Sequence, residues 1–291
     1  MVGKAYAGAR AGVAGVRAQG TRTVAGVTIP LRPGAGRAAR PAPRPTGPDP
    51  LAPLLQLPGV AEAAEDARTA VDRLLGHKVL RRESAGVSAE SALRGARASA
   101  ALEGVDRPLA EVRAGEVTDP VLPGSLRVSV ALGSLVETWE RAPGQVLARL
   151  HVLAAADLAD RADLGRPNGQ AGPRLGGLFS ITTGATTVPA VVLAGVVHGE
   201  LAALAPFGTQ DGVVARAAGR LVGITRGLDP KAVSVPEVGL AELGREAYAA
   251  ALAGYRSGEP SGVAGWLVHC ARATEHGATE GLAICESLLR G

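Results

Sequence analysis

The segment best suited to chemistry is Leu204–Arg216, which reads Leu-Ala-Pro-Phe-Gly-Thr-Gln-Asp-Gly-Val-Val-Ala-Arg. Helical patterns flank it, so a short glycine-containing loop leads into the N-terminus of a helix. Such an N-terminus presents free backbone amides and the positive end of the helix dipole, which favour a phosphate group. The alternative is a tight corner between two helices, with Asp211 as the N-cap residue and Phe207 filling the core beneath the loop.

The histidines do not form a metal-binding pattern. The chain has five of them, His77, His151, His198, His269 and His276. His269 and His276 lie about two helical turns apart, but no further ligand residues cluster near them. We therefore expect structural histidines and no metal site. No P-loop, nucleophile elbow or dinucleotide-binding glycine motif occurs either.

The loop resembles the Fic (Fido) motif, His-Pro-Phe-x-(Asp/Glu)-Gly-Asn-Gly-Arg-x-x-Arg. Pro206, Phe207, Gly212 and Arg216 match this motif. The resemblance covers about residues 58–291 and implies a Fic-like all-α domain. Members of the family typically transfer AMP from ATP to a hydroxyl on a target protein (AMPylation). The resemblance thus implies a nucleotidyltransferase-like protein, with ATP and Mg²⁺ as cofactors and a protein as its target.

The loop departs from the motif at the positions that carry the family's chemistry. Ala205 stands where the family has its catalytic histidine, the general base for the attacking hydroxyl. The other departures are Thr209 for the acidic metal ligand, Gln210 for the first glycine, Asp211 for the asparagine and Val213 for the first arginine, with Gly208 at the variable position. The loop therefore lacks the family's base, its Mg²⁺ anchor and a phosphate clamp.

A second resemblance lies upstream, in Ser99-Ala-Ala-Leu-Glu103-Gly104. This segment is similar to (Ser/Thr)-x-x-x-Glu-(Gly/Asn), the inhibitory-helix motif of Fic proteins. It implies that Glu103 pairs with Arg216 and blocks the position of the ATP γ-phosphate. Ser99, one turn earlier, would then lie near the loop backbone. His198, seven residues before the loop, matches a structural histidine that Fic helices often carry.

Helices must position both motifs. Apolar periodicity and Gly or Pro punctuation predict about eight helices, near 60–75, 89–103, 127–141, 144–160, 190–204, 212–226, 236–257 and 261–290. Gly195 and Gly199, four residues apart, predict a helix face that another helix approaches closely. Between 165 and 188, Gly and Pro pairs and the β-prone run Phe179–Thr183 predict an irregular connection with a small β-hairpin flap.

Charge divides the chain in two. Residues 1–48 hold eight of the 31 basic residues and none of the 27 acidic ones, so residues 49–291 carry 23 basic against 27 acidic residues. The net charge of +4 thus comes from the N-terminal segment, and a nucleic-acid-binding body is disfavoured. We expect a disordered, low-complexity basic tail over 1–57, able to contact nucleic acid only weakly, and a folded domain over 58–291. An acid-free, arginine-rich start is also typical of a transit peptide, which is the alternative.

The amino-acid composition indicates the type of fold and the cellular compartment. Hydrophobic residues make up 46% of the chain and aromatic residues 2%, which favours close-packed helices built from small side chains. Two cysteines rule out a disulfide framework and indicate a reducing, cytoplasmic setting. The longest uncharged apolar stretch, Val188–Val197, is too short to span a bilayer, and the chain does not open with a signal peptide. The Ala, Gly, Pro and Arg bias is typical of a GC-rich, bacterial coding sequence.

Three hypotheses about function remain in competition, and whether the chain is an enzyme stays open. The first is a pseudoenzyme, a Fic-fold protein that has lost AMP transfer and serves as a binding or regulatory module for an unknown partner. The second is an active nucleotidyl- or phosphoryl-transferase with altered loop chemistry, in which Asp211 or Glu200 is the base. A plain helical interaction protein with a chance motif match is a third hypothesis. Nucleotide binding separates them.

Overall fold

The computed structural model describes residues 21–24, 27–30 and 49–290. Its body, residues 49–290, consists of eleven α-helices and two short 3₁₀-helices, η1 (Ala52–Gln56) and η2 (Lys78–Arg81). The α-helices are α1 (Val60–Leu75), α2 (Ser84–Leu102), α3 (Leu109–Ala114), α4 (Val121–Trp139), α5 (Pro143–Ala155), α6 (Gly172–Thr183), α7 (Ala190–Leu204), α8 (Asp211–Thr225), α9 (Pro236–Leu243), α10 (Arg245–Ser257) and α11 (Pro260–Arg290). The prediction of an all-α domain is confirmed. Within the described residues the only sheet is the antiparallel pair β1 (Thr21–Val24) and β2 (Val27–Pro30).

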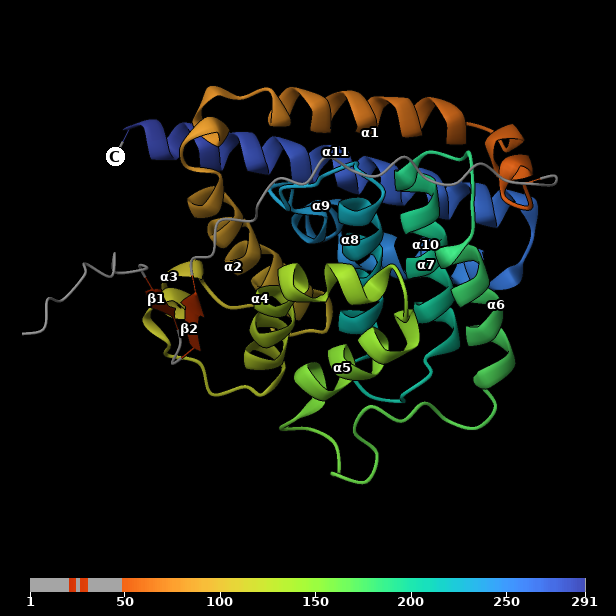
Figure 1. Ribbon diagram of the computed structural model, residues 1–291, viewed down its shortest axis with the longest axis horizontal. Coiled ribbons are helices and arrows are strands. Elements are labelled where there is room, and N and C mark those ends of the chain that lie inside the picture. Colours follow the sequence, from red (N-terminus) through yellow and green to blue (C-terminus); the bar gives the residue numbers. More distant parts are fainter. Residues whose placement is uncertain (1–20, 25–26, 31–48, 291) are drawn as a thin grey trace, which may run out of the picture.

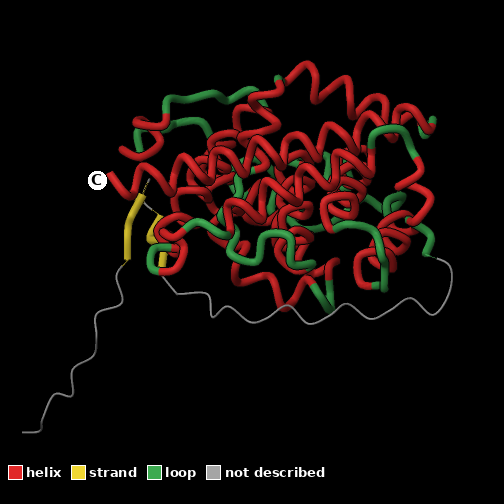
Figure 2. Tube along the Cα trace, turned by 90° about the horizontal axis from the view of Figure 1, so that it is seen from above, coloured by secondary structure: helices red, strands yellow, loops and turns green. Residues whose placement is uncertain are grey.

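Helix α8 is the centre of the domain. Every residue of α8 from Val213 to Gly223 is buried, because α2, α4, α5 and α7 all pack against it. Helix α7 is apolar except for His198 and Glu200, as expected of a helix largely surrounded by protein. Helix α1 lies along the long helix α11 and covers one side of the body (Figure 1). In Figure 2, viewed from above, helices make up most of the body, and the two strands lie at one end.

Glycines let α11 and α10 approach α7. A Cβ at Gly199 would lie 2.6 Å from Trp266 Nε1 and 2.9 Å from the Tyr255 ring, and one at Gly195 would lie 3.0 Å from Leu267 Cδ2. The Trp266 indole fills this space and donates its N–H to Gly195 O at 2.8 Å. The close approach predicted from the spacing of Gly195 and Gly199 is therefore confirmed.

The helix pattern is richer than the eight helices predicted. Helix α3 was not predicted, and the stretch 236–257 is divided into α9 and α10 by Gly244, whose φ of 101° breaks the helix. The predicted β-hairpin at 165–188 is wrong, because Phe179–Thr183 belongs to α6. Leu175, Leu178 and Thr182 are the buried residues of α6, and their helical spacing decides against the weak β preference of the segment.

The folded body starts earlier in the sequence than predicted. Leu51 is buried in the core. Asp49 accepts hydrogen bonds from the backbone N–H of Leu51 and from the N–H and hydroxyl of Thr187. Residues 49–57 therefore pack on the body, contrary to the boundary placed at residue 58, because an apolar anchor and a capping carboxylate fix them. The prediction of disorder concerns mainly residues outside the described part.

Candidate functional site

The loop between α7 and α8 contains three residues in the left-handed region. Ala205 ends α7 with φ 46°, Gly208 has φ 76°, and Gln210 precedes α8 with φ 54°. Gln210 is the N-cap residue and its side chain makes no capping bond. Asp211 is therefore the first residue of α8, and the prediction of Asp211 as N-cap is wrong. Its Oδ1 reaches back into the loop and accepts the Phe207 N–H at 2.9 Å.

Helix α5 contributes His151, which contacts this loop. The imidazole is fully buried and its Nδ1 accepts the Gly165 N–H at 2.9 Å. Because a backbone N–H can only donate, the neutral ring carries its hydrogen on Nε2 and donates it to Thr209 Oγ1, 3.1 Å away. The ring also stacks on Phe207, with centroids 4.3 Å apart and planes at 8°. His151 thus anchors the loop, and in this tautomer it does not act as a base toward Thr209.

A neighbouring segment holds the start of the loop. The backbone N–H of Asn168 donates to Pro206 O at 2.8 Å and its side-chain amide donates to the same oxygen at 3.2 Å. The Ala171 N–H donates in turn to Asn168 Oδ1 at 3.0 Å. Residues 165–171 and 205–211 therefore form two connected loops, joined by His151 and Asn168. Neither residue belongs to the motif, and no local pattern in the sequence pointed to them.

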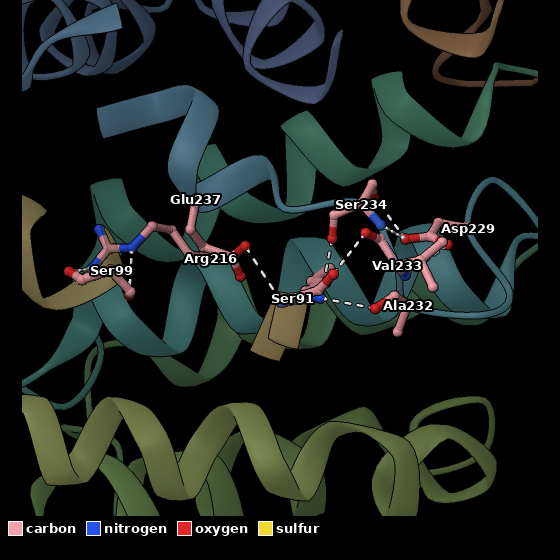
Figure 3. A network of polar contacts seen from close by, with 9 residues as sticks. Ser91, Ser99, Arg216, Asp229, Ala232, Val233, Ser234 and Glu237 are labelled. Carbon is pink, nitrogen blue, oxygen red and sulfur yellow. Dashed lines mark hydrogen bonds and ion pairs between the residues drawn. The ribbon is translucent and has the colours of Figure 1, made fainter. Parts of the chain in front are cut away.

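Arg216 on α8 binds the end of α2. Its Nη2 lies 2.7 Å from Glu103 Oε1, in an ion pair whose Arg216 side chain is 1% exposed and whose Glu103 side chain is 28% exposed. Its Nε donates to Ser99 Oγ at 2.9 Å and its Nη2 donates to Ser99 O at 3.0 Å. The predicted contact of Glu103 with Arg216 is present. Ser99 faces the guanidinium (Figure 3), whereas we expected it near the loop backbone.

The end of α2 aims Glu103 at the first turn of α8. The chain reverses at Gly104, whose φ is 97°, and Val105 and Gly104 donate to the carbonyls of Ala100 and Ala101. This arrangement is the usual glycine termination of a helix. A Cβ at Gly212 would lie only 2.2 Å from Glu103 Oε1. A carboxylate of the chain itself therefore occupies the space against the N-terminal turn of α8, the place where we expected a phosphate.

Tyr248 lies beside the Arg216 guanidinium and is hydrogen-bonded to His198. Tyr248 lies with its ring centroid 5.9 Å from Arg216 Cζ and its hydroxyl 2.9 Å from His198 Nε2. Burial, with added repulsion from Arg216 and His269, holds the pKa of His198 well below its usual value. His198 is thus a buried structural histidine.

A buried polar network joins α2, α8 and the segment before α9. Ser91 on α2 donates to Val233 O at 2.8 Å (Figure 3). Arg220, one turn after Arg216, donates to the carbonyls of Ala232 and Ser234 and lies 3.5 Å from Glu237. Asp229 accepts the N–H and hydroxyl of Ser234 at 2.8 and 2.7 Å. The network fixes the chain on one side of α8 and leaves Arg216 little freedom to move.

The described residues do not fit the cofactors that the motif resemblance implies. Thr209, at the position of the acidic metal ligand, is held by His151, and residues 49–290 contain no group of three His, Cys, Asp or Glu side chains placed to hold a metal. Val213, at the position of the first arginine, is 2% exposed and packs in the core. Glu103 and Asp211 place two carboxylates at the N-terminal turn of α8, where an anionic phosphate would meet like charge.

The other carboxylate considered as a base is engaged elsewhere. Glu200 Oε2 pairs with Arg174 at 2.7 Å, and its Oε1 accepts the Tyr255 hydroxyl at 2.9 Å. Burial and the neighbouring Glu200 raise the pKa of Tyr255, so this hydroxyl keeps its proton. Across the described helices, none is both long and apolar enough to cross a membrane.

Comparison with known proteins gives a fold. No protein-family model matches the chain, and no curated protein matches it. Solved structures do. A fragment of Fic-1 (residues 134–508) from C. elegans aligns with a TM-score of 0.63 at 16% identity, covering 81% of this chain and 75% of that one. A Fic family protein from Desulfovibrio desulfuricans G20 aligns with a TM-score of 0.62 at 18% identity, covering 77% and 74%. The helical body of this chain therefore has the Fic (Fido) fold, as the motif resemblance predicted.

Proposed function

We propose that this chain is a pseudoenzyme of the Fic fold, a cytoplasmic binding or regulatory module that does not transfer AMP by the mechanism typical of Fic proteins. One observation carries the proposal: the residues at the motif's chemical positions take part in packing and structural bonds instead. Ala205 offers no base, Thr209 is held by His151, and Val213 is buried in the core. The pairing of Glu103 with Arg216 adds the contact that the inhibitory-helix resemblance implies.

Each missing group has a cost in rate, although such costs do not simply add for groups that act together. A placed general base is worth about 10²–10⁴-fold in rate, and Ala205 supplies none. Each lost charge-stabilising donor costs about 10²–10³-fold, and Val213 is such a loss. A fixed carboxylate about 4 Å from a phosphate charge adds repulsion of about 4 kcal/mol at an effective dielectric constant of 20. Together these terms remove the activity even if a nucleotide reaches the loop.

The altered-chemistry transferase has less support. Both oxygens of Glu200 have partners in Arg174 and Tyr255. Burial raises the pKa of Asp211, its bonds to the Phe207 and Gly208 amides oppose this, and Glu103 adds to the rise. A raised pKa would suit a base, but one Asp211 oxygen already accepts the Phe207 N–H. The engaged state of both carboxylates favours the binding module.

Labelled ATP and Mg²⁺ test the proposal. The wild type, Ala205→His, and a combined variant (Ala205→His, Thr209→Asp, Asp211→Asn, Val213→Arg, Glu103→Gly) are compared for AMP incorporation into the protein itself or a lysate, and for a change in melting temperature. We expect no labelling and no nucleotide-dependent shift for the first two proteins. An active Fic protein assayed in parallel is the positive control.

The combined variant has the best chance of activity, but Val213 is buried. Its helical content is therefore measured first, and the same variant without Val213→Arg accompanies it. Robust labelling by the wild type, lost in Asp211→Asn or Glu200→Gln, would overturn the proposal and establish the altered-chemistry transferase. A wild-type melting shift with ATP and Mg²⁺ but no labelling would show a nucleotide-binding module, against the blocked phosphate site.

A further inference from the structure

Among the described residues, His151 is the side chain that joins both loops of the site through hydrogen bonds that depend on its protonation state. Its Nδ1 accepts the Gly165 N–H and its Nε2 meets Thr209 Oγ1. We propose that His151 is a pH-sensitive latch, whose neutral imidazole ties residues 165–171 to the 205–211 loop and whose protonation releases that loop. This inference does not depend on the proposed function, because it concerns only the loop's attachment.

The chemistry of the two contacts makes the latch selective for the neutral ring. Only the neutral tautomer with its hydrogen on Nε2 satisfies both, since a backbone N–H needs an acceptor at Nδ1. Protonation places a hydrogen on Nδ1, directly opposite the Gly165 N–H. Two donors then face each other, and the imidazole or residue 165 must move. A Cβ at Gly165 would lie 3.1 Å from Ala148 O, so this residue is closely packed against α5.

Movement of the His151 ring would break its contacts with the 205–211 loop. The imidazole stacks on Phe207 at a centroid distance of 4.3 Å, and Phe207 packs against the core. When the ring shifts, Phe207 loses its stacking partner and Thr209 loses its hydrogen bond. The remaining hydrogen bonds between the two loops come from Asn168, which binds Pro206 O and does not titrate, and Asp211 still accepts the Phe207 N–H. Protonation therefore frees Thr209 and the Phe207 ring from α5, whereas Pro206 stays held.

Charged groups around the ring do not compensate its protonation. Helix α5 itself carries Arg149, and the helices that pack against it carry Arg127 and Glu137 on α4, Arg174 on α6, and Asp211, Arg216 and Arg220 on α8. The segment that leads to Gly165 adds the acids and arginines of residues 157–166. No carboxylate among the described residues lies within ion-pair distance of the imidazole. Burial consequently dominates and lowers the pKa of His151 below 6.5, against a smaller opposing effect of Thr209.

Hydrogen exchange of the intact chain between pH 7.5 and 5, corrected for intrinsic rates, measures the latch. We expect the Gly165 amide and residues 207–211 to lose protection as the pH falls below the pKa of His151, by up to about tenfold per pH unit for one proton. His151→Gln retains a side-chain acceptor and donor but does not titrate, so its protection is expected to be independent of pH. His77→Gln is the matched control, because His77 also accepts a backbone N–H, from Val79, but lies away from the loop.

Two results would overturn the latch. One is wild-type protection at Gly165 that stays constant over this pH range. The other is a His151→Gln profile that still follows the wild type, which would assign the effect to another group such as Asp211; Asp211→Asn identifies that case. NMR of the wild-type imidazole keeps the test decisive even if the glutamine variant folds poorly. Its ¹⁵N shifts must report an Nε2–H tautomer at pH 7.5, and a Nδ1–H tautomer would refute the proposal.

Discussion

Replacing Glu103 by glutamine should destabilise the fold, because Arg216 would lose the carboxylate with which it pairs. Glutamine keeps the shape and one hydrogen-bonding oxygen but removes the charge. A hydrogen bond to a charged group contributes about 1.5–3 kcal/mol, and removing one partner of a fully buried pair costs about 3–5 kcal/mol. Glu103 is 28% exposed and Arg216 keeps both contacts with Ser99, so the lower range applies. We expect a loss of about 1–2 kcal/mol in the free energy of unfolding, discounted for this exposure.

Urea unfolding followed by circular dichroism measures this loss, with melting temperature as a second readout. Arg216→Met should cost more, about 3–5 kcal/mol, because it leaves Ser99 and Glu103 without their partner. The double variant gives the coupling energy, which we expect to be about 1–2 kcal/mol. Glu137→Gln is the matched control, because the pair of Glu137 with Arg141 is exposed at 3.6 Å and such pairs contribute little. If Glu103→Gln were no more destabilising than Glu137→Gln, the ion pair would not hold α2 on α8 and the reasoning would fail.

Three further predictions follow from the same contacts. Gly212→Ala should push the Glu103 carboxylate away from α8, since the new Cβ would lie 2.2 Å from Oε1. Urea unfolding should show a clearly smaller loss of unfolding free energy when Gly212→Ala is made in a Glu103→Ala background, and equal losses would count against the contact. The free energy of unfolding should fall as the pH drops below 6.5, because burial lowers the pKa of His151, His198 and His269. The folded state then binds fewer protons than the unfolded state until each folded pKa is reached. Urea midpoints from pH 7.5 to 5 check this, and a flat profile would contradict it. Gly239→Ala should cost about 3 kcal/mol or more by overpacking, because its Cβ would lie 2.0 Å from Ala273 O on α11. The control Gly133→Ala, whose Cβ would meet nothing within 4 Å, should gain up to about 1 kcal/mol from helix propensity. Similar melting temperatures for the two variants would refute the close packing of α9 on α11.

The sequence by itself determined the all-helical class, the two helices around the loop and the pairing of Glu103 with Arg216. Helix periodicity is a local signal, and Pro or Gly residues mark the helix ends within a few positions. Helices 190–204 and 212–226 were therefore placed to within one residue at either end. The resemblance of two short segments to Fic motifs implied the ion pair, although Glu103 and Arg216 lie 113 residues apart.

The tertiary structure decided which groups the loop contacts. His151 and Asn168 come from segments with no motif, and each reaches the loop only because α5 and residues 165–171 pack beside it. Asp211 looked like an N-cap, but the left-handed Gln210 takes that position and turns the carboxylate back to Phe207. Helix α6 formed where local β preference was weak, because burying Leu175 and Leu178 on one face contributes more. Such long-range contacts depend on the packing of whole helices, which residue types and spacing along the chain do not encode locally.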